Sequence, residues 1–194
     1  MKLYNYKIPK QLGGIDSDIN WYKDVHKEIW FDHEYSRYGV EVKENDIVVD
    51  CGANVGLFSL YALHKGAKHV YSYECSEEII PSLTYNLKDT NSTIIKGYVG
   101  DKHIKIENIL NFVNLPFIDF IKIDIEWAEY DLLLNTPNEF LKRINNWVIE
   151  FHDFNNNAVK MLQIIEMFSK CGFDCSLEQI HKNSNLMLLY IKKR

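Results

Sequence analysis

The sequence predicts an α/β fold, a doubly wound, seven-stranded, mainly parallel sheet with an antiparallel C-terminal hairpin strand. From Ile47 onward, short apolar runs typical of strands alternate with helical patterns. Strands that are separated by helices form parallel βαβ units with right-handed crossovers. The last two strand-like runs, Phe173–Gln179 and Leu186–Lys192, are joined only by a turn at Lys182–Asn185. They must therefore pair as a hairpin, which places one antiparallel strand in the sheet.

The first elements of the sheet follow in order from Ile47. Ile47–Asp50 is a short apolar strand, and Val55–His64 is a helix with apolar residues on nearly every side. His69–Glu74 is the second strand. Ser76 can cap the next helix, but Pro81 predicts that this helix begins late or is kinked.

The remaining elements continue the same alternation. We expect strands at Thr93–Val99, Phe117–Asp124 and Trp147–Phe151, and helices at Ile106–Asn114, Ala128–Leu134 and Asn156–Cys171. Gly172 follows the last helix as its stop. A chain of 194 residues suits a single such domain.

The first 40 residues have a different character. Between Asn20 and Tyr38, tryptophans, tyrosines and phenylalanine are interleaved with charges and histidines. We expect residues 1–40 to form an N-terminal cap or lid over residues 41–194, which form the main domain. A helix packed against the sheet edge is an equally good interpretation, because aromatic side chains mostly serve as core.

Composition excludes several classes of function. The formal net charge is -5, and the basic residues are dispersed, which argues against a nucleic-acid partner. No apolar run approaches the roughly 20 residues that a membrane span needs. The N-terminus lacks an apolar signal core, so we expect a cytoplasmic protein with no membrane association.

A glycine turn after the first strand predicts a cofactor site. The turn has the pattern Asp50-x-Gly52-x-x-x-Gly56, and Asn54 stands where a dinucleotide-binding turn has its second glycine. The carboxylate of Asp50 at the strand end suits a cationic ligand group better than a pyrophosphate. Asn54 can offer amide contacts to a carboxylate of the same ligand.

Glu74 ends the neighbouring strand and adds a ribose site. A carboxylate at that position can accept both ribose hydroxyls. Ala53 and Cys75 flank the two strand ends, and Gly100 and Asp101 follow the third strand, where an adenine ring would lie. The sequence therefore predicts that these residues bind a nucleoside cofactor.

Acidic residues and a histidine follow the fourth and fifth strands. Asp124, Glu126 and Glu129 crowd one loop and helix start, where a cation, sugar hydroxyls or a shifted pKa is expected. His152 can act as a general base, because its pKa lies near neutral pH. We expect Asp124, Glu126 and His152 to be catalytic. Alternatively, these three residues could hold a divalent metal that acidifies a hydroxyl.

At these positions the chain resembles the FkbM-type S-adenosylmethionine-dependent methyltransferases. The resemblance spans residues 34–152 and rests on residues 49–59, on Tyr73-Glu74, on residues 120–129 and on residues 149–152. It implies a class I, Rossmann-like methyltransferase fold with S-adenosylmethionine as the cofactor. It also implies O-methylation of a hydroxyl on a sugar, glycan or other small molecule. We predict no metal ligands, although a divalent metal is possible.

Trp127 departs from the resemblance, because the family usually has glycine at that position. A tryptophan there would reshape the acceptor pocket or stack on a ring. A methyltransferase-like scaffold without turnover is therefore one alternative. A nicotinamide-dependent reductase is another, although its Tyr61-x-x-x-Lys65 pair falls in the first helix, far from where that chemistry needs it.

Overall fold

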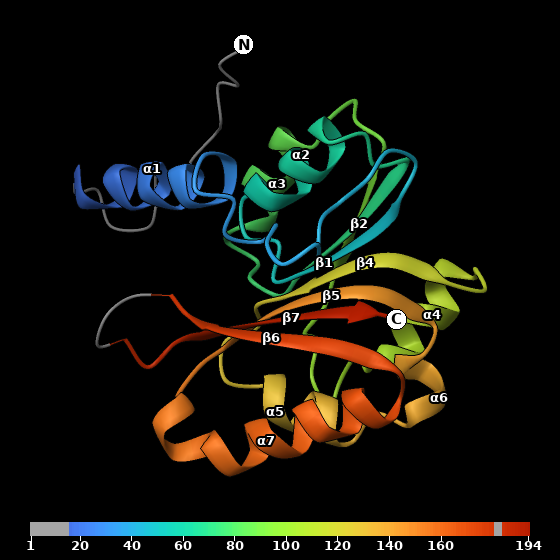
Figure 1. Cartoon of the computed structure of the whole chain (residues 1–194). Coiled ribbons are helices and arrows are strands. Elements are labelled where there is room, and N and C mark those ends of the chain that lie inside the picture. Colours follow the sequence, from blue (N-terminus) through green and yellow to red (C-terminus); the bar gives the residue numbers. More distant parts are fainter. Residues whose placement is uncertain (1–15, 181–183) are drawn as a thin grey trace.

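The computed structural model describes residues 16–180 and 184–194, and its centre is one seven-stranded sheet (Figure 1). The strand order is β3-β2-β1-β4-β5-β7-β6. The strands are β1 (Ile47–Cys51), β2 (His69–Glu74), β3 (Ser92–Lys96), β4 (Ile118–Ile123), β5 (Ile144–Phe151), β6 (Phe173–Gln179) and β7 (Met187–Lys193). Only β7 runs antiparallel to its neighbours, so the predicted mainly parallel sheet with a C-terminal hairpin is confirmed.

Helices cover both faces of the sheet (Figure 1). They are α1 (Asp16–Trp30), α2 (Leu57–His64), α3 (Ile80–Asn86), α4 (Ile106–Val113), α5 (Glu129–Leu134), α6 (Asn138–Leu141) and α7 (Phe154–Lys170). Apolar residues of α1, α2 and α3 pack on one face, and those of α4, α5, α6 and α7 pack on the other. Within the described residues, no helix is both long and apolar enough to cross a membrane.

Alternation along the strands decides what each face presents. In β1, Val48 packs with the core under α1 and α2, whereas Val49 packs with the core under α4 to α7. The same alternation places Phe120 of β4 and Val148 of β5 under α1 and α2. Polar residues two positions further along these strands therefore lie on the α1 and α2 face, close to the carboxyl edge.

The predicted end of the third strand and the predicted Ser76 cap were wrong, and β5 begins at Ile144 and not at Trp147. The strand predicted at Thr93–Val99 ends at Lys96, because the chain turns away once the Gly97 amide has bonded the Glu74 carbonyl oxygen at 2.9 Å. Ser76 does not cap α3 with its side chain; its carbonyl oxygen instead accepts amide hydrogen bonds from Ile79 and Ile80 in a preceding turn. The late helix start that Pro81 predicts is confirmed.

The N-terminal segment contributes a helix to the α2 side of the sheet. Tyr22 and Ile29 of α1 are buried in the core that also holds Phe58 and Tyr61 of α2. The predicted cap begins in residues 1–15, which lie outside the described residues, as does part of the predicted turn at Lys182–Asn185.

Candidate active site at the carboxyl edge of the sheet

Two cavities meet at the carboxyl edge of the sheet. The smaller, of about 400 Å³, lies between the ends of β2, β3 and β4, and the larger, of about 490 Å³, lies between β4, β5 and α1. They share four lining residues, Gly52, Asn54, Asp124 and Glu126. A ligand in the smaller cavity can therefore reach a ligand in the larger one.

Glu74 stands in the smaller cavity with its carboxylate fixed by the backbone. Its Oε1 accepts hydrogen bonds from the amides of Cys75 and Ser76, and its Oε2 accepts one from the amide of Asn54, each at 2.8 Å. An ionised carboxylate offers about four acceptor positions. The backbone thus fills three of them and leaves a position on Oε2 for a ligand hydroxyl.

Close packing also requires glycine at two positions of the turn, Gly52 and Gly56. Gly52 has φ of +79°, and a Cβ atom there would lie 1.7 Å from the carbonyl oxygen of Asp124. Gly56 has φ of +90° and begins α2 against Leu83. The glycines therefore bring the ends of β1 and β4 together and allow α2 to start.

Asn54 lines both cavities in a left-handed conformation, with φ of +49°. Its side-chain oxygen accepts a hydrogen bond from the Val55 amide at 2.8 Å, which holds the turn. Within the described part of the chain, its side-chain NH₂ group donates to no protein atom. That group is thus available to a ligand carboxylate.

Asp50 lies behind the cavities and lines neither of them. It is fully buried, accepts a hydrogen bond from Ser59 Oγ at 2.6 Å, and has Lys122 Nζ at 3.4 Å from its Oδ1. Lys122 Nζ also lies 3.3 Å from Asp124 Oδ2 and donates to the Gly52 carbonyl at 2.9 Å. From the sequence we expected a ligand to place a positive charge beside Asp50. In the structure Lys122 of β4 provides that charge.

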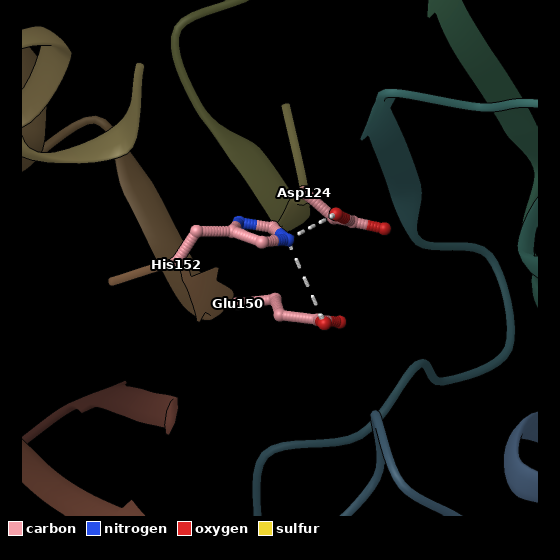
Figure 2. Close-up of side chains that lie close together, drawn as sticks. All are labelled: Asp124, Glu150 and His152. Atoms are coloured by element: carbon pink, nitrogen blue, oxygen red, sulfur yellow. Dashed lines mark ion pairs between the residues drawn. The ribbon is translucent and has the colours of Figure 1, made fainter. Parts of the chain in front are cut away.

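Asp124, Glu150 and His152 come together in the larger cavity (Figure 2). His152 Nε2 lies 4.0 Å from Asp124 Oδ1 and 4.0 Å from Glu150 Oε1, as the dashed lines in Figure 2 mark. Its Nδ1 lies 2.9 Å from Glu129 Oε1 on α5, and Glu129 is fully buried. The ligand atoms of Asp124, Glu150 and His152 all lie within 4.8 Å of one another, a spacing that a metal ion can bridge.

The pKa values of this cluster differ from those expected at the sequence level. Burial would lower the pKa of His152, but the Glu129 hydrogen bond and the charges of Glu129, Asp124 and Glu150 raise it to about 9. Burial and the charge of Asp124 raise the pKa of Glu150 to about 7, although Tyr35 donates a hydrogen bond to Glu150 Oε2 at 2.8 Å. At neutral pH, His152 is therefore charged, and Glu150 is the group poised to exchange a proton.

Some of the predicted site residues line the two cavities, and others do not. Of the nearby candidates, Ala53 lines the larger cavity and Cys75 the smaller, whereas Gly100 and Asp101 line neither. Asp101 instead lies 3.7 Å from Lys105 in an ion pair. The wall where the adenine was expected is formed by Gly97, Tyr98 and Val99, three residues nearer the strand end.

Three functional candidates were missed by the sequence reasoning: Tyr35, Lys122 and Glu150. All three line the larger cavity. Strand alternation was the available signal for two of them, because Lys122 and Glu150 have the same parity as the core residues under α1 and α2. Tyr35 gives no comparable signal, since its place depends on how the segment after α1 folds back over the sheet.

Comparison with known proteins shows what this chain is similar to. The model of the methyltransferase FkbM domain matches residues 92–175. The 31-O-demethyl-FK506 methyltransferase FkbM of Streptomyces tacrolimicus is 47% identical over 38 residues, which are 20% of this chain and 15% of that protein. Residues 92–175 of the chain are thus similar to the FkbM methyltransferase domain.

Other proteins that are similar to this chain are longer. AMB antimetabolite synthetase AmbE of Pseudomonas aeruginosa is 22% identical over 234 residues, covering 84% of this chain and 11% of AmbE. Protein arginine N-methyltransferase 1 of Oryza sativa subsp. indica is 34% identical over 113 residues, covering 55% of this chain and 26% of that enzyme. The chain therefore spans about a quarter or less of these curated relatives.

Solved structures agree with the fold of this chain. An rRNA methylase from Streptococcus thermophilus has a TM-score of 0.58 at 21% identity, covering 85% of this chain and 95% of that one. A Streptococcus mutans protein in complex with SAH has a TM-score of 0.56 at 17% identity, covering 79% and 91% of the two chains. The chain thus has the class I methyltransferase fold.

Trp127 departs from the glycine that the FkbM resemblance led us to expect at this position. Trp127 has φ of +76° and follows Glu126, which has φ of +48°. Glycine adopts this left-handed region freely, whereas an L-residue such as tryptophan is strained there. Here the indole is 69% exposed, lines the smaller cavity and lies 6.0 Å from the His152 ring, between centroids.

The smaller cavity fits the nucleoside part of S-adenosylmethionine, the cofactor that the FkbM resemblance implies. The Glu74 carboxylate faces the cavity with an acceptor position for a ribose hydroxyl, and Tyr98 and Val99 form an apolar wall for a flat ring. Asn54 stands at the junction with an NH₂ group available for the amino-acid end.

Proposed function

We propose that this protein is an S-adenosylmethionine-dependent methyltransferase that methylates a hydroxyl of a small molecule. The observation that carries the proposal is the pair of cavities joined at Gly52, Asn54, Asp124 and Glu126. One has a carboxylate suited to ribose, and the other has a group that can accept a proton near neutral pH. The similar protein FkbM is a 31-O-demethyl-FK506 methyltransferase, which supports a hydroxyl acceptor.

In this proposal the smaller cavity holds the cofactor. Glu74 binds the ribose, Asn54 binds the amino-acid end, and Gly97–Val99 take the adenine-side position that Gly100 and Asp101 were expected to take. When bound, S-adenosylmethionine supplies a methyl group already activated on a sulfonium. Asp50 and Lys122 act behind the cavity as positioning residues, since their charges hold the ends of β1 and β4 together.

We assign removal of the hydroxyl proton to Glu150. A general base works best when its pKa lies near the operating pH, and the pKa of Glu150 is raised to about 7. His152, with its pKa raised to about 9, remains protonated and orients Asp124 and Glu150. Asp124 and Glu126 stand where the two cavities join, so they align the acceptor oxygen.

The N-terminal segment is proposed to cover the acceptor. Tyr22, Val25 and Ile29 of α1 and Tyr35 after it line the larger cavity. Closure of this kind excludes water and orients the acceptor, and orientation can supply several kcal/mol of barrier reduction, roughly 7 or more in favourable cases. Residues 1–40 would then act as the cap, and residues 41–194 as the methyltransferase domain.

A divalent metal is not part of the proposal. Because His152 is charged at neutral pH and its Nδ1 is bonded to Glu129, it is a poor ligand without loss of a proton. Methyl transfer should therefore be unchanged after exhaustive dialysis against a chelator. A loss of turnover that Mg²⁺ or Zn²⁺ restores would assign the cluster of Asp124, Glu150 and His152 to a metal instead.

Calorimetric titration with S-adenosylhomocysteine and with NADH tests the cofactor. We expect S-adenosylhomocysteine to bind and NADH not to bind. Glu74→Gln should weaken S-adenosylhomocysteine by about 1–2 kcal/mol, whereas Glu139→Gln, an exposed change on α6, should have no effect. Binding of NADH alone would indicate the reductase alternative.

An acceptor screen with a labelled methyl donor separates an enzyme from a scaffold. Turnover with any hydroxyl acceptor should fall about 10²–10⁴-fold in Glu150→Gln, and less in His152→Gln. Tight S-adenosylhomocysteine binding with no transfer to any hydroxyl, amine or protein acceptor would favour the catalytically silent scaffold.

A further inference from the structure

The larger cavity is strongly acidic. Among the described residues that line it are six carboxylates and two cations, Lys122 and His152. The six acids are Asp24, Glu28, Glu34, Asp124, Glu126 and Glu150. Like charges in one cavity repel, and a low-dielectric wall strengthens that repulsion. The cavity therefore favours a cationic occupant over a neutral one and disfavours a phosphate.

Both cations in the wall are already engaged. Lys122 Nζ lies 3.4 Å from Asp50 Oδ1 and 3.3 Å from Asp124 Oδ2. His152 Nδ1 lies 2.9 Å from Glu129 Oε1. Asp50 and Glu129 stand behind the lining and share these two positive charges with Asp124 and Glu150, so the two cations offset only part of the negative charge of the cavity.

Glu34 is a buried acid of this cavity whose carboxylate has no partner among the described residues. The residue is only 8% exposed, yet within the described residues its carboxylate accepts no hydrogen bond and joins no ion pair. The nearest cation, Arg37, is paired with Glu178. Burial and the charges of Glu28 and Glu150 raise the pKa of Glu34 to about 8. A buried carboxylate without a partner is costly unless a ligand pairs with it.

The reacting end of the cavity lies beside this carboxylate. Tyr35, the residue after Glu34, donates its hydrogen bond to Glu150, the proposed proton acceptor. An acceptor that places a hydroxyl at Glu150 therefore brings its neighbouring substituents toward Glu34. A compact molecule with a hydroxyl and a cationic group a few bonds apart matches both ends.

We propose that the acceptor is an amino alcohol, such as an amino sugar, whose ammonium group pairs with Glu34. The assignment rests on the proposed methyl transfer for the hydroxyl end, whereas the cationic end follows from the cavity alone. An ammonium group carries three donors, so it can pair with Glu34 and still donate hydrogen bonds to other acceptors of the cavity. The carboxylates thus select the substrate by charge before its hydroxyl reaches Glu150.

Serinol and glycerol test the charge preference, because serinol has an ammonium group where glycerol has a hydroxyl. Ligand-observed NMR titration of the full chain, loaded with S-adenosylhomocysteine, gives a dissociation constant for each. We expect serinol to bind at least about tenfold more tightly than glycerol, which corresponds to roughly 1.4 kcal/mol. Equal binding of the two would overturn the proposal.

Two variants locate the preference. Glu34→Gln keeps the shape of the side chain and should reduce the preference for serinol to less than about threefold. Asp24→Asn removes an exposed acid from the same cavity and should leave most of the preference intact. A preference that survives Glu34→Gln but is lost in Asp24→Asn, or is lost equally in both, would exclude Glu34 as the specific partner.

The same samples separate failure of this inference from failure of the proposed function. S-adenosylhomocysteine binding reports on the smaller cavity, which Glu34 does not line, so it should be unchanged in Glu34→Gln and also proves folding. No S-adenosylhomocysteine binding by any sample would refute the proposed function, and the serinol comparison on the free protein would still stand. Displacement of serinol by Mg²⁺ alone would instead identify a metal site and overturn the proposal.

Discussion

At the scale of single residues, Lys122 is the charge on which the site depends. It is buried, and it contacts Asp50, Asp124 and the Gly52 carbonyl from the middle of the sheet. Removing one partner of a buried ion pair leaves an uncompensated charge in a region of low dielectric. The ends of β1 and β4 therefore hold their arrangement because this ammonium neutralises two carboxylates.

We expect Lys122→Met to lower the free energy of unfolding by about 3–5 kcal/mol, because Asp50 stays buried without its cation. Urea denaturation followed by circular dichroism measures the change. The double variant Lys122→Met/Asp50→Asn should recover much of the loss, since it removes the orphaned charge as well. Equal losses in the single and double variants would mean that lost packing of the lysine stem, and not charge, dominates.

Trp127 combines a strained backbone conformation with a side chain that lines the smaller cavity. Its left-handed backbone, with φ of +76°, costs an L-residue roughly 1–2 kcal/mol. Glycine avoids that cost but loses more conformational entropy on folding, which destabilises the folded state by about 0.5–1 kcal/mol. Because the indole is 69% exposed, little buried area is lost on its removal. Trp127→Gly should therefore keep or raise the free energy of unfolding, by up to about 1 kcal/mol.

The same variant should weaken binding in the smaller cavity, whose wall the indole completes. Calorimetry with S-adenosylhomocysteine checks this expectation, with Trp127→Asn as the control that keeps a side chain tolerant of the left-handed region. A variant that is destabilised by more than about 1 kcal/mol would show that the contact with His152 matters more than the strain.

At the scale of elements, sequence periodicity identified the sheet better than it identified the site. The hairpin of β6 and β7 and all five parallel strands follow from apolar runs and turn residues, since both signals are local. The end of β3 does not follow from local signals. It depends on a contact with another strand, the hydrogen bond from the Gly97 amide to the Glu74 carbonyl oxygen of β2. Gly97, Tyr98 and Val99 line the smaller cavity for that reason, whereas Gly100 and Asp101 do not.

Glu150, the proposed base, is a second feature that the local sequence could not identify. His152 was the natural choice from its ordinary pKa, and Glu150 looked like an interior strand residue. Only the packing of Glu129, Asp124 and Glu150 around one imidazole raises the pKa of His152 to about 9, and only burial beside Asp124 raises that of Glu150 to about 7. Such shifts depend on neighbours far apart in the chain, so they have no signature in a single stretch of sequence.

The junction of β1 and β4 gives a prediction at this scale. A Cβ atom at Gly52 would meet the Asp124 carbonyl oxygen at 1.7 Å, so Gly52→Ala must push the two strand ends apart. Gly172→Ala is the matched control, because Gly172 has φ of +92° but nothing within 4 Å of its added Cβ. We expect the control to lose about 1–2 kcal/mol from its backbone conformation alone, and Gly52→Ala to lose clearly more.

Thermal and urea unfolding of both variants measure the difference. S-adenosylhomocysteine binding should disappear in Gly52→Ala and persist in Gly172→Ala, since only Gly52 lines the cavities. Equal stability losses in the two variants would mean that the β1 and β4 ends can move apart without cost.

At the scale of the whole molecule, the fold gathers acids on one face of the sheet near its carboxyl edge. Asp50, Lys122 and Glu150 lie on neighbouring strands β1, β4 and β5 under α1 and α2, where strand alternation places them. The loop after α1 then adds Glu34 to the same cavity. The folded state therefore holds protons that the unfolded chain releases at lower pH.

This excess of bound protons predicts how stability depends on pH. The pKa of Glu150 is raised to about 7 and that of Glu34 to about 8, whereas both would titrate near 4.5 when unfolded. The pKa of His152 is raised to about 9 from 6.5, so its stabilising contribution is complete below 6.5 and is lost as the pH rises through 9. For all three groups the folded state binds more protons, so the free energy of unfolding should fall from about pH 5 to about pH 9.

Urea denaturation at a series of pH values measures the slope, and variants assign it. Glu34→Gln should flatten the curve mainly between about pH 5 and 8, and His152→Gln mainly between about pH 6.5 and 9, because each removes one group whose proton affinity rises on folding. Asp24→Asn, at an exposed acid of the same cavity, should leave the slope unchanged. Serinol should also reduce the slope of the wild-type protein if its ammonium group takes the place of the proton on Glu34. A wild-type curve that rises from about pH 5 to about pH 8 would mean that these carboxyl groups are already ionised and paired in the folded state.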